Sequence, residues 1–355
     1  MKRRCKVALL WLAKCLGVFW LTRALTRGGF VVVGWHGVSL ADEHLRLPKY
    51  FISRQTLRRR IAYLHKRFRI TSLDSVVGQR ERRRLVPSQV VLTFDDGMYN
   101  FAGGAVPILR EFEAPATLFV VSSYLSGENL GFRLMIRDLF QQTPLDTLPA
   151  LEWMDGQGGS LRENMEKHVE AAVRACAALP PEAGAREIFL RRLAHALRVD
   201  IEPLIQNRIW DHLSADEIRE LANEGFDMQV HSHLHIPVTE QPESVYNDTR
   251  MSRALIESAS GRKATDYCYP SGLWSRSSWE ALEESGMRTA VTTKLGPNFA
   301  LTPAMALRRY VDDETISQLE FEAMVSGVPW LVHLLFHPRR LFEPSEASST
   351  STPLY

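Results

Sequence analysis

The sequence predicts an α/β fold in which a parallel β-sheet has helices packed outside it. The first observation is the order of the elements, because short apolar, β-branched runs alternate with amphipathic helical segments along most of the chain. The second is that polar residues directly follow several apolar runs, where parallel folds carry their functional loops. The third is composition: 355 residues, 45% hydrophobic and 24% charged, can bury a substantial core.

Each element follows from its spacing and its end signals. Leu57, Ile61 and Leu64 recur at helical spacing and define the first helix of the main domain. Ser214 and Glu217 form a capping-box pattern, which starts a later helix. In chain order, the predicted strands are 29–39, a short piece within 70–77, 90–94, 116–121, 226–230, 265–269 and 288–293, and the predicted helices are 53–68, 99–113, 214–225, 244–260 and 275–285.

Residues 124–212 interrupt this alternation. The segment is helical and charged, with a glycine-rich loop at 156–159. We expect a helical insertion between core strands rather than a separate catalytic domain. The main domain is accordingly predicted over 29–327, after a basic and apolar segment at 1–28 and before an apolar segment and disordered tail at 328–355.

Two adjacent carboxylates end the apolar strand at 90–94. Asp95 and Asp96 are followed by Gly97. Two acids at the end of a buried strand are costly to desolvate unless their charge is compensated. A divalent cation would compensate it, with one carboxylate binding the cation and the other left as a base. The alternative is a plain strand-to-turn sequence, since Asp and Gly are common turn residues.

Three histidines follow the predicted strand at 226–230. His231 and His235 are four residues apart, and on a helical turn this spacing places both imidazoles on one side, within reach of one cation. Two histidines and a carboxylate with open positions suit zinc or another divalent metal. His233 has the wrong parity to join them and is expected to play a supporting or incidental role. A polar surface loop is the alternative interpretation.

These two motifs together resemble those of the NodB-homology polysaccharide deacetylases, carbohydrate esterase family four. Thr93-Phe94-Asp95-Asp96-Gly97 is similar to the first motif of that family, and His231-Ser232-x-x-His235 to the second. The resemblance runs from about Gly29 to Gly327 and fits poorly over 124–212. It implies a distorted (β/α) barrel with a helical insertion and metal-dependent removal of N-acetyl groups from amino sugars.

The resemblance also implies a role for each matched residue. Asp95 would be the general base, and Asp96 would bind the metal together with His231 and His235. Ser232 would support the turn between the histidines. A divalent cation, with zinc as the first candidate, would polarise the amide carbonyl and activate a water molecule, and Asp95 would take the proton as that water attacks.

The third motif departs from the commonest family pattern. The family usually places an arginine two residues before a proline, whereas this chain has Cys268 before Tyr269-Pro270. This resembles the Tyr-Pro-x-Gly variant of exopolysaccharide-linked members. A later segment, Leu307-Arg308-Arg309-Tyr310, also resembles that variant, and Arg309 is expected to replace the missing arginine by orienting Asp95.

Two histidines are candidates for the acid that protonates the departing amine. Trp35-His36-Gly37-Val38 resembles the Tyr-His-x-Val of the exopolysaccharide-linked branch, in which a histidine from an N-terminal strand can serve as the acid. Leu331-Val332-His333 matches the residues of the usual C-terminal Leu-x-His motif but lies beyond the alternating strands and helices. The sequence therefore favours His36 over His333.

A basic and apolar segment begins the chain. Four basic residues between Lys2 and Lys6 precede an apolar stretch from Val7 to Trp20, which resembles the start of a signal peptide. Lys14 interrupts the stretch, no clear cleavage site follows, and the run is short for a transmembrane helix. We therefore favour a segment lying in the membrane interface of a cytoplasmic or membrane-associated protein. Export by an uncleaved segment stays open.

Charge and cysteine usage exclude some classes of protein. The net charge of +2 argues against a strong nucleic-acid binder. Ten basic residues gather at 58–69 and 80–84, where we expect a solvated helix face and loop, with contact to acidic lipid or an anionic substrate carrier as the alternative. The four cysteines contain no CxxC pair and indicate neither a disulfide framework nor a thiolate zinc site.

Two functions of different class remain. The first is a metal-dependent deacetylase that acts on an N-acetylated glycan or a lipid-linked amino sugar, with possible contact to a membrane surface and no nucleic-acid partner. The second is a catalytically weak carbohydrate-binding or assembly protein that retains the fold, which the altered third motif and the unclear Leu-x-His motif favour. The complete set of Asp95, Asp96, His231 and His235 argues for the enzyme.

Overall fold

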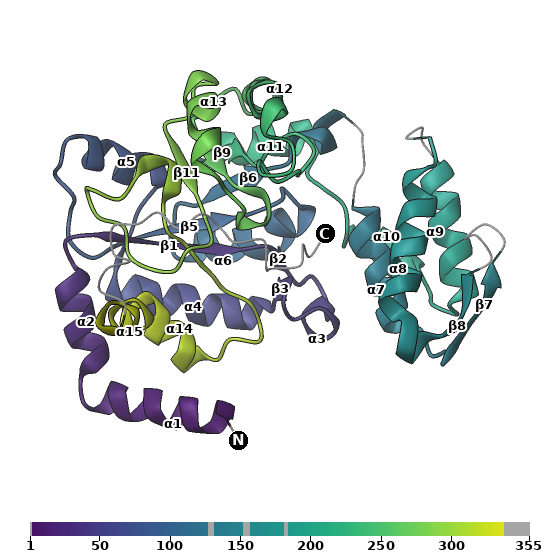
Figure 1. Ribbon diagram of the computed structural model, residues 1–355, viewed down its shortest axis with the longest axis horizontal. Helices are drawn as coiled ribbons and strands as arrows, with labels where there is room; N and C mark the ends of the chain where they lie inside the picture. The colour runs from purple at the N-terminus through teal and green to yellow at the C-terminus, as the bar shows by residue number, and fades with distance from the viewer. Residues whose placement is uncertain (1, 127–130, 152–156, 181–183, 337–355) are drawn as a thin grey trace.

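The computed structural model describes residues 2–126, 131–151, 157–180 and 184–336. Its main feature is an eight-stranded sheet in which every strand pair is parallel (Figure 1). The strand order is β11-β10-β9-β6-β5-β1-β12, and β4 pairs with the first part of β5. These strands are β1 (Phe30–Trp35), β4 (Arg69–Ile70), β5 (Gln89–Phe94), β6 (Thr117–Val120), β9 (Asp227–Val230), β10 (Asp266–Cys268), β11 (Thr289–Val291) and β12 (Tyr310–Val311).

The sheet curls until its two edges meet. Tyr310 of β12 pairs with Val33 of β1, and Leu307, three residues earlier, forms a parallel bridge to Val291 of β11. The segment 307–311 therefore connects β11, at one edge of the sheet, to β1 near the other edge. A curled parallel sheet with helices around it is a distorted (β/α) barrel, and the predicted fold class is confirmed.

Helices surround this barrel, and one of them closes the end opposite the C-termini of the strands. Apolar side chains of α5 pack with the inward-facing side chains of β1, β5, β6, β10 and β11, so α5 closes the end opposite the strands' C-termini. The helices of the main domain are α4 (Arg54–Arg67), α5 (Leu73–Glu81), α6 (Val106–Glu111), α11 (Ala215–Asn223), α12 (Val245–Ser260), α13 (Trp279–Glu284) and α14 (Gln318–Val325). Two short strands, β2 (Gly37–Val38) and β3 (Phe51–Ile52), form a separate parallel pair.

Alternation along β5 decides where the first carboxylate points. The even-numbered side chains of β5 pack in the large apolar layer beneath the outer helices. Val91 packs inside the barrel instead, within the second apolar layer. Because strand side chains alternate with a period of two, Thr93 and Asp95 continue the inward series. Asp95 therefore stands at the mouth of the barrel, above an apolar floor.

A helical lobe lies beside the barrel and contains most of the predicted insertion (Figure 1). Its elements are α7 (Phe132–Gln142), β7 (Thr147–Leu151), β8 (Gln157–Ser160), α8 (Leu161–Ala177), α9 (Ala185–Ala196) and α10 (Glu202–Gln206). The lobe has its own apolar cluster, which Phe51 and Met98 join from the barrel side. Asp138 of α7 accepts hydrogen bonds from Arg46 and Trp210 and so ties the lobe to α3 (Glu43–Arg46). The domain limits given above stay a prediction.

Two further helices precede β1. α1 (Lys2–Cys15) and α2 (Val18–Thr26) meet at Gly17, whose φ of 76° allows the sharp change of direction. They pack against α14 and α15 (Val328–Phe336). Among the described residues, no single helix has the length and apolar character needed to cross a bilayer. Only Cys5–Cys15 and Val18–Thr26 taken together reach that length and composition, and they are bent by 73°.

Several parts of the chain differ from the sequence predictions, and among them the strand predicted at 29–39 is two strands, β1 and β2, in separate sheets. Residues predicted as a short strand and loop form α5, because Ser72 accepts a hydrogen bond from the backbone of Ser75 and starts a helix. The two-residue strand β12 was not predicted, since so short a strand gives no periodic signal. The segment predicted as apolar at 328–336 is α15, and the predicted tail from 337 onward lies outside the described residues.

Arg60 corrects the expectation that the first basic run is a solvated helix face. Its side chain is buried, and its Nε donates to Asp312 at 3.0 Å. Trp35 Nε1 donates to the same carboxylate oxygen, also at 3.0 Å. Arg58 follows the expectation, because it is exposed and pairs with Glu111 at the surface. The run therefore combines surface charge with a buried pair that links α4 to the segment after β12.

A buried carboxylate at the start of β10 predicts pH-dependent stability. Burial raises the pKa of Asp266 from 3.8 to about 6, despite hydrogen bonds from Thr289 and Thr265. A carboxyl group whose pKa is higher in the folded state loses its stabilising contribution as the pH rises from about 4 through about 6. Asp266→Asn should remove this loss and raise the free energy of unfolding at about pH 8 by on the order of 2–3 kcal/mol. Urea denaturation across that pH range measures it, and parallel curves for both proteins would contradict it.

Candidate metal and catalytic site

The six residues singled out in the sequence meet at the C-terminal ends of the strands. His36 follows β1, Asp95 and Asp96 follow β5, and His231 follows β9. His235 lies on the same loop as His231, and Arg309 immediately precedes β12. Contacts of at most 3.7 Å connect all six through the two carboxylates.

Asp96, His231 and His235 form a set of donors suited to one cation. The Oδ1 atom of Asp96 lies 3.5 Å from Nε2 of His231 and 3.7 Å from Nε2 of His235. All three donor atoms lie within 4.8 Å of one another. Zinc bonds of about 2.0–2.2 Å in tetrahedral geometry separate two ligands by about 3.4 Å. One carboxylate oxygen and two imidazole nitrogens at these distances therefore fit a divalent metal ion.

Hydrogen bonding fixes how His231 presents its donor atom. Its Nδ1 lies 2.8 Å from the carbonyl oxygen of Cys268, which can only accept, so Nδ1 carries the proton and donates it. Nε2 is then the atom turned toward Asp96. A ligating histidine that donates its other ring N–H to a carbonyl is the usual arrangement in metal sites.

Electrostatics at the donor set favour a positive charge. Burial lowers the pKa of His231, but Cys268 and the two carboxylates outweigh it and hold the pKa well above its ordinary value. Burial lowers the pKa of His235 to about 4, so this imidazole is neutral and keeps its lone pair at neutral pH. Burial raises the pKa of Asp96, yet its hydrogen bond to His231 and the nearby histidines bring it below the usual range. A neutral imidazole and an ionised carboxylate are the protonation states that bind metal.

The loop that carries His231 and His235 is not the helical turn predicted from their spacing. Ser232 and His235 have left-handed backbone angles, with φ of 62° and 59°. The Ser232 hydroxyl accepts a hydrogen bond from the backbone N–H of His235 at 2.8 Å, and the Ser232 carbonyl accepts one from Ser252 at 3.0 Å. A side chain and a neighbouring helix therefore hold the loop in shape. Non-glycine residues with left-handed backbone angles are found preferentially at active and ligand-binding sites.

Arg309 holds Asp95 through two hydrogen bonds. Nη1 donates to Oδ1 at 2.6 Å and Nη2 to Oδ2 at 2.8 Å, and both side chains are buried. Burial alone would raise the pKa of Asp95, but Arg309, His231 and His36 together bring it below its ordinary value. Asp95 is therefore ionised at neutral pH, and the fork of the guanidinium fixes its orientation.

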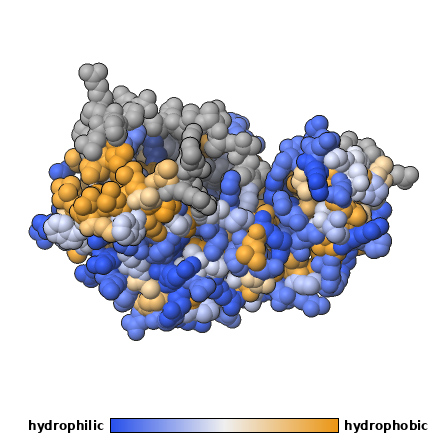
Figure 2. Space-filling model, turned by 90° about the horizontal axis from the view of Figure 1, so that it is seen from below, coloured by the Kyte–Doolittle hydropathy of each residue, from blue (hydrophilic) through white to orange (hydrophobic). Residues whose placement is uncertain are grey.

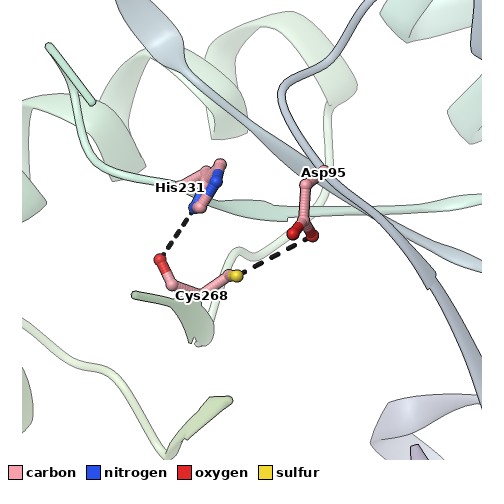
Figure 3. Close-up of side chains that lie close together, drawn as sticks. All are labelled: Asp95, His231 and Cys268. Atoms are coloured by element: carbon pink, nitrogen blue, oxygen red, sulfur yellow. Dashed lines mark hydrogen bonds between the residues drawn. The ribbon is translucent and has the colours of Figure 1, made fainter. Parts of the chain in front are cut away.

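A second group, Asp95, His231 and Cys268, also lies close together (Figure 3). The Cys268 thiol is 3.7 Å from Oδ1 of Asp95, and the Cys268 carbonyl accepts the hydrogen bond from His231. Nη2 of Arg309 lies 3.2 Å from the Cys268 sulfur. The guanidinium thus already supplies the positive charge at this position, which disfavours a metal ion there. The small Cys268 side chain lies against the guanidinium where the commonest family pattern has an arginine of its own.

Gly34 makes room for Arg309. A Cβ atom at Gly34 would lie 3.0 Å from both Cδ and Nη1 of Arg309 and 3.1 Å from the Thr93 hydroxyl. Arg309 is buried and donates two hydrogen bonds to Asp95, so its side chain cannot move aside without weakening those bonds.

Gly34→Ala is expected to destabilise the fold by about 1–3 kcal/mol, as overpacking does, and to lower turnover because Arg309 shifts away from Asp95. Gly78→Ala is the matched control, since nothing lies within 4 Å of its added Cβ in helix α5. That control should be neutral or stabilising. Thermal unfolding and turnover of both variants measure the difference, and equal stability would count against this role for Gly34.

The two candidate acids lie in different places. Nε2 of His36 is 3.7 Å from Oδ2 of Asp95, and its side chain is 24% exposed, so a ligand in the mouth of the barrel can reach it. His333 lies on the exposed side of α15, a helix that packs against α2 and α14. The structure therefore brings His36, and not His333, to the group around Asp95.

A pocket of about 380 Å³ opens beside the donor set, between barrel and lobe. Asp96 and His235 line one side of it, and Arg133 of α7 lines another. Sequence reasoning missed two further lining residues, His212 and Tyr124, whose rings stack with centroids 3.3 Å apart. Both fall within the predicted insertion, where a lone histidine gives no spacing signal.

His212 reaches the site through a pairing between distant segments. It forms a β-bridge with Met98, and the backbone N–H of Leu213 donates to the carbonyl of Gly97. The chain returning from the lobe is thus bonded to the loop that follows Asp96. Burial lowers the pKa of His212 to about 3, so its imidazole is neutral.

The comparisons with known proteins agree with this geometry. A family model described as polysaccharide deacetylase matches residues 82–145 and 197–290. The matched parts contain Asp95, Asp96, His231 and His235, and the gap between them falls within the lobe. Over these two segments the chain matches the polysaccharide deacetylase family. The predicted resemblance is confirmed over these segments.

Proteins similar to this chain include the poly-β-1,6-N-acetyl-D-glucosamine N-deacetylase of Escherichia coli K12. The two are 32% identical over 99 residues, which is 27% of this chain and 14% of that protein. Solved structures with a similar fold include the deacetylase PplD of Streptococcus pyogenes in complex with acetate, with a TM-score of 0.56 and 14% identity over 84% of this chain and 99% of that one. IcaB of Ammonifex degensii gives a TM-score of 0.52 and 16% identity, with 84% and 98% of the two chains covered.

His36 and Arg309 lie outside the segments that the family model matches. Both come from the strands that close the barrel, β1 and β12, and from far apart in the sequence. The family match therefore says nothing about these two residues, and their place in the site rests on their contacts with Asp95 in the structure.

Proposed function

We propose that this protein is a metal-dependent deacetylase that hydrolyses the N-acetyl group of amino sugars in a glycan. One observation carries the proposal. An ionised carboxylate, held by a buried arginine, stands directly beside a separate set of one carboxylate and two imidazoles. The two adjacent acids thus have different partners and different work, with Asp95 as the base and Asp96 as the metal ligand.

The chemistry follows from the positions of these groups. A divalent cation held by Asp96, His231 and His235 would supply Lewis acidity toward the amide carbonyl and a lowered pKa for water. Asp95 accepts a proton from the water whose oxygen forms the new bond to the carbonyl carbon. His36, in its protonated form, gives a proton to the sugar nitrogen as the carbon–nitrogen bond breaks. The products are acetate and the free amine.

Substrate and metal are finer parts of the proposal. The relative named above acts, by its name, on poly-β-1,6-N-acetyl-D-glucosamine, which supports a polymer of N-acetylhexosamine as substrate here. A lipid-linked amino sugar is the alternative, because the reaction centre is the same for both. Two histidines and one carboxylate suit zinc first, and cobalt, nickel or iron bind the same donor set.

An acetate-release assay tests the function. Protein purified without chelator is assayed on chito-oligosaccharides, on poly-β-1,6-N-acetylglucosamine and on a lipid-linked N-acetyl amino sugar, and its metal content is measured. Stoichiometric metal with acetate release on one of these supports the enzyme and selects the substrate class. Absence of bound metal, with no release on any of them, would favour the carbohydrate-binding alternative.

The general acid is assigned by two histidine variants. His36→Ala should lower kcat by about 10²–10⁴-fold and leave metal content unchanged, because His36 contacts Asp95 and is not part of the donor set. His333→Ala, on the far exposed helix, should leave kcat unchanged. The reverse result, with His36→Ala active and His333→Ala inactive, would overturn the assignment.

A further inference from the structure

Helix α1 packs on the protein through Leu10 and Ala13 and turns other large apolar side chains outward. On the side that packs against α14, Lys6 pairs with Glu320 at 2.9 Å and Lys14 with Glu322 at 2.5 Å. Leu10 packs between them against the small apolar cluster of α14 and α2. These two ion pairs and the contact between them fix which side of α1 is turned outward.

The outward side of α1 and α2 is apolar. We call this surface the apolar face. Its large side chains are between 49% and 72% exposed, and they are Leu9, Trp11, Leu12, Leu16, Trp20, Leu21 and Leu25. They are half of the fourteen exposed large hydrophobic side chains found in the described residues, and they come from a short stretch of sequence. Figure 2 shows a broad hydrophobic area on one side of the molecule, seen from below. Contiguous apolar surface of this kind marks an interaction site.

The charge of the segment indicates the partner. Residues 1–28 contain seven Lys or Arg residues and no Asp or Glu, and Glu320 and Glu322 of α14 offset the charge of two of them, Lys6 and Lys14. A second copy of this chain would place the same basic segment against itself, whereas an anionic bilayer offers both complementary charge and apolar depth. Exposed Trp11 and Trp20 suit the interface between headgroups and acyl chains, where tryptophan is enriched.

The arrangement favours a helix pair lying in the interface over one that crosses the bilayer. A straight span needs about 20 apolar residues, and these two short helices are bent by 73° at Gly17. The ion pairs of Lys6 and Lys14 also hold α1 along its length against α14. We propose that α1 and α2 insert the apolar face into the headgroup and outer acyl region of an anionic lipid bilayer, and that the catalytic domain is held at that surface.

Vesicle flotation of the full chain tests this proposal. The protein is mixed with vesicles of phosphatidylcholine alone or of phosphatidylcholine with phosphatidylglycerol, and it should float with the anionic vesicles. Leu16→Glu should lower the partition coefficient by about tenfold. Ile188→Glu is the matched control, because Ile188 is a similarly exposed apolar side chain on the lobe, and it should bind like the parent. Failure of the parent to float, or equal loss in both variants, would overturn the proposal.

Two exposed cysteines give a second readout that needs no substitution. Cys5 and Cys15 are exposed on α1, whereas Cys176 and Cys268 are buried. Anionic vesicles should shield Cys5 and Cys15 from a water-soluble maleimide, and alkaline carbonate should still release the protein. Retention after carbonate would show a spanning segment, and shielding in a lipid-free dimer would show a second copy as the partner, and either result contradicts the proposal. Acetate release from soluble chito-oligosaccharides, assayed in parallel, reports on the catalytic proposal independently.

Discussion

Asp95→Asn is expected to lower kcat for acetate release by about 10²–10⁴-fold, the usual contribution of a general base. Asparagine keeps the shape of the side chain, and its carbonyl oxygen still accepts one hydrogen bond from Arg309. It has no charge with which to take a proton from water. Bound metal should stay stoichiometric, because the donor atoms belong to Asp96, His231 and His235. Steady-state kinetics and metal analysis on the same preparation measure both quantities.

Asp96→Ala is the variant that separates the two roles. It removes the carboxylate that faces both imidazole nitrogens, so activity and metal content should fall together. Activity that survives Asp95→Asn, or metal that is lost with it, would show that the two acids do not divide the work as proposed. A pair of variants one residue apart is a sensitive test, because both carboxylates share the same strand end and the same burial.

Local sequence patterns predicted the parts of the site that lie within one loop. Asp95 and Asp96 could be predicted because a buried strand alternates its side chains and ends in two charges. His231 and His235 could be predicted for a similar reason, although the loop that carries them is left-handed rather than helical. The error did not move the donor atoms, because the Ser232 hydroxyl holds the backbone of His235 in its place.

Residues that depend on distant pairing were beyond the sequence pattern. Arg309 lies beside Asp95 because the segment 307–311 bridges the first and last strands of the barrel, and β12 is only two residues long. It was named only through the family resemblance. His212 has no such resemblance to rely on, and it reaches the pocket because the chain leaving the lobe pairs with the loop after Asp96. Side-chain alternation and capping residues predict the strands and helices of the barrel. Its closure depends on pairing between distant segments, which leaves no local sequence signal.

Arg309→Met is expected to destabilise the protein by about 3–5 kcal/mol, because it leaves the buried carboxylate of Asp95 without its charge partner. Urea denaturation measures the change in the free energy of unfolding. The same substitution should cost on the order of 2 kcal/mol less in an Asp95→Asn background, where no charge is left to compensate. Additive costs in this double-mutant cycle would show that Arg309 contributes only packing, and that the two hydrogen bonds of 2.6 and 2.8 Å carry no coupling energy.

The buried pair of Arg60 and Asp312 supplies the matched control for this cycle. Its Nε–Oδ2 distance is 3.0 Å, and both side chains are as buried as those of the Arg309 pair. Arg60→Met should therefore destabilise the fold by a similar amount, yet kcat of the folded fraction should stay unchanged, because Arg60 contacts neither carboxylate of the site. Arg309→Met should lower both stability and kcat, since Asp95 loses its fixed orientation along with its charge partner. Equal kcat in the two variants would leave Arg309 a structural residue, and the orientation of Asp95 would then have to come from the strand end alone.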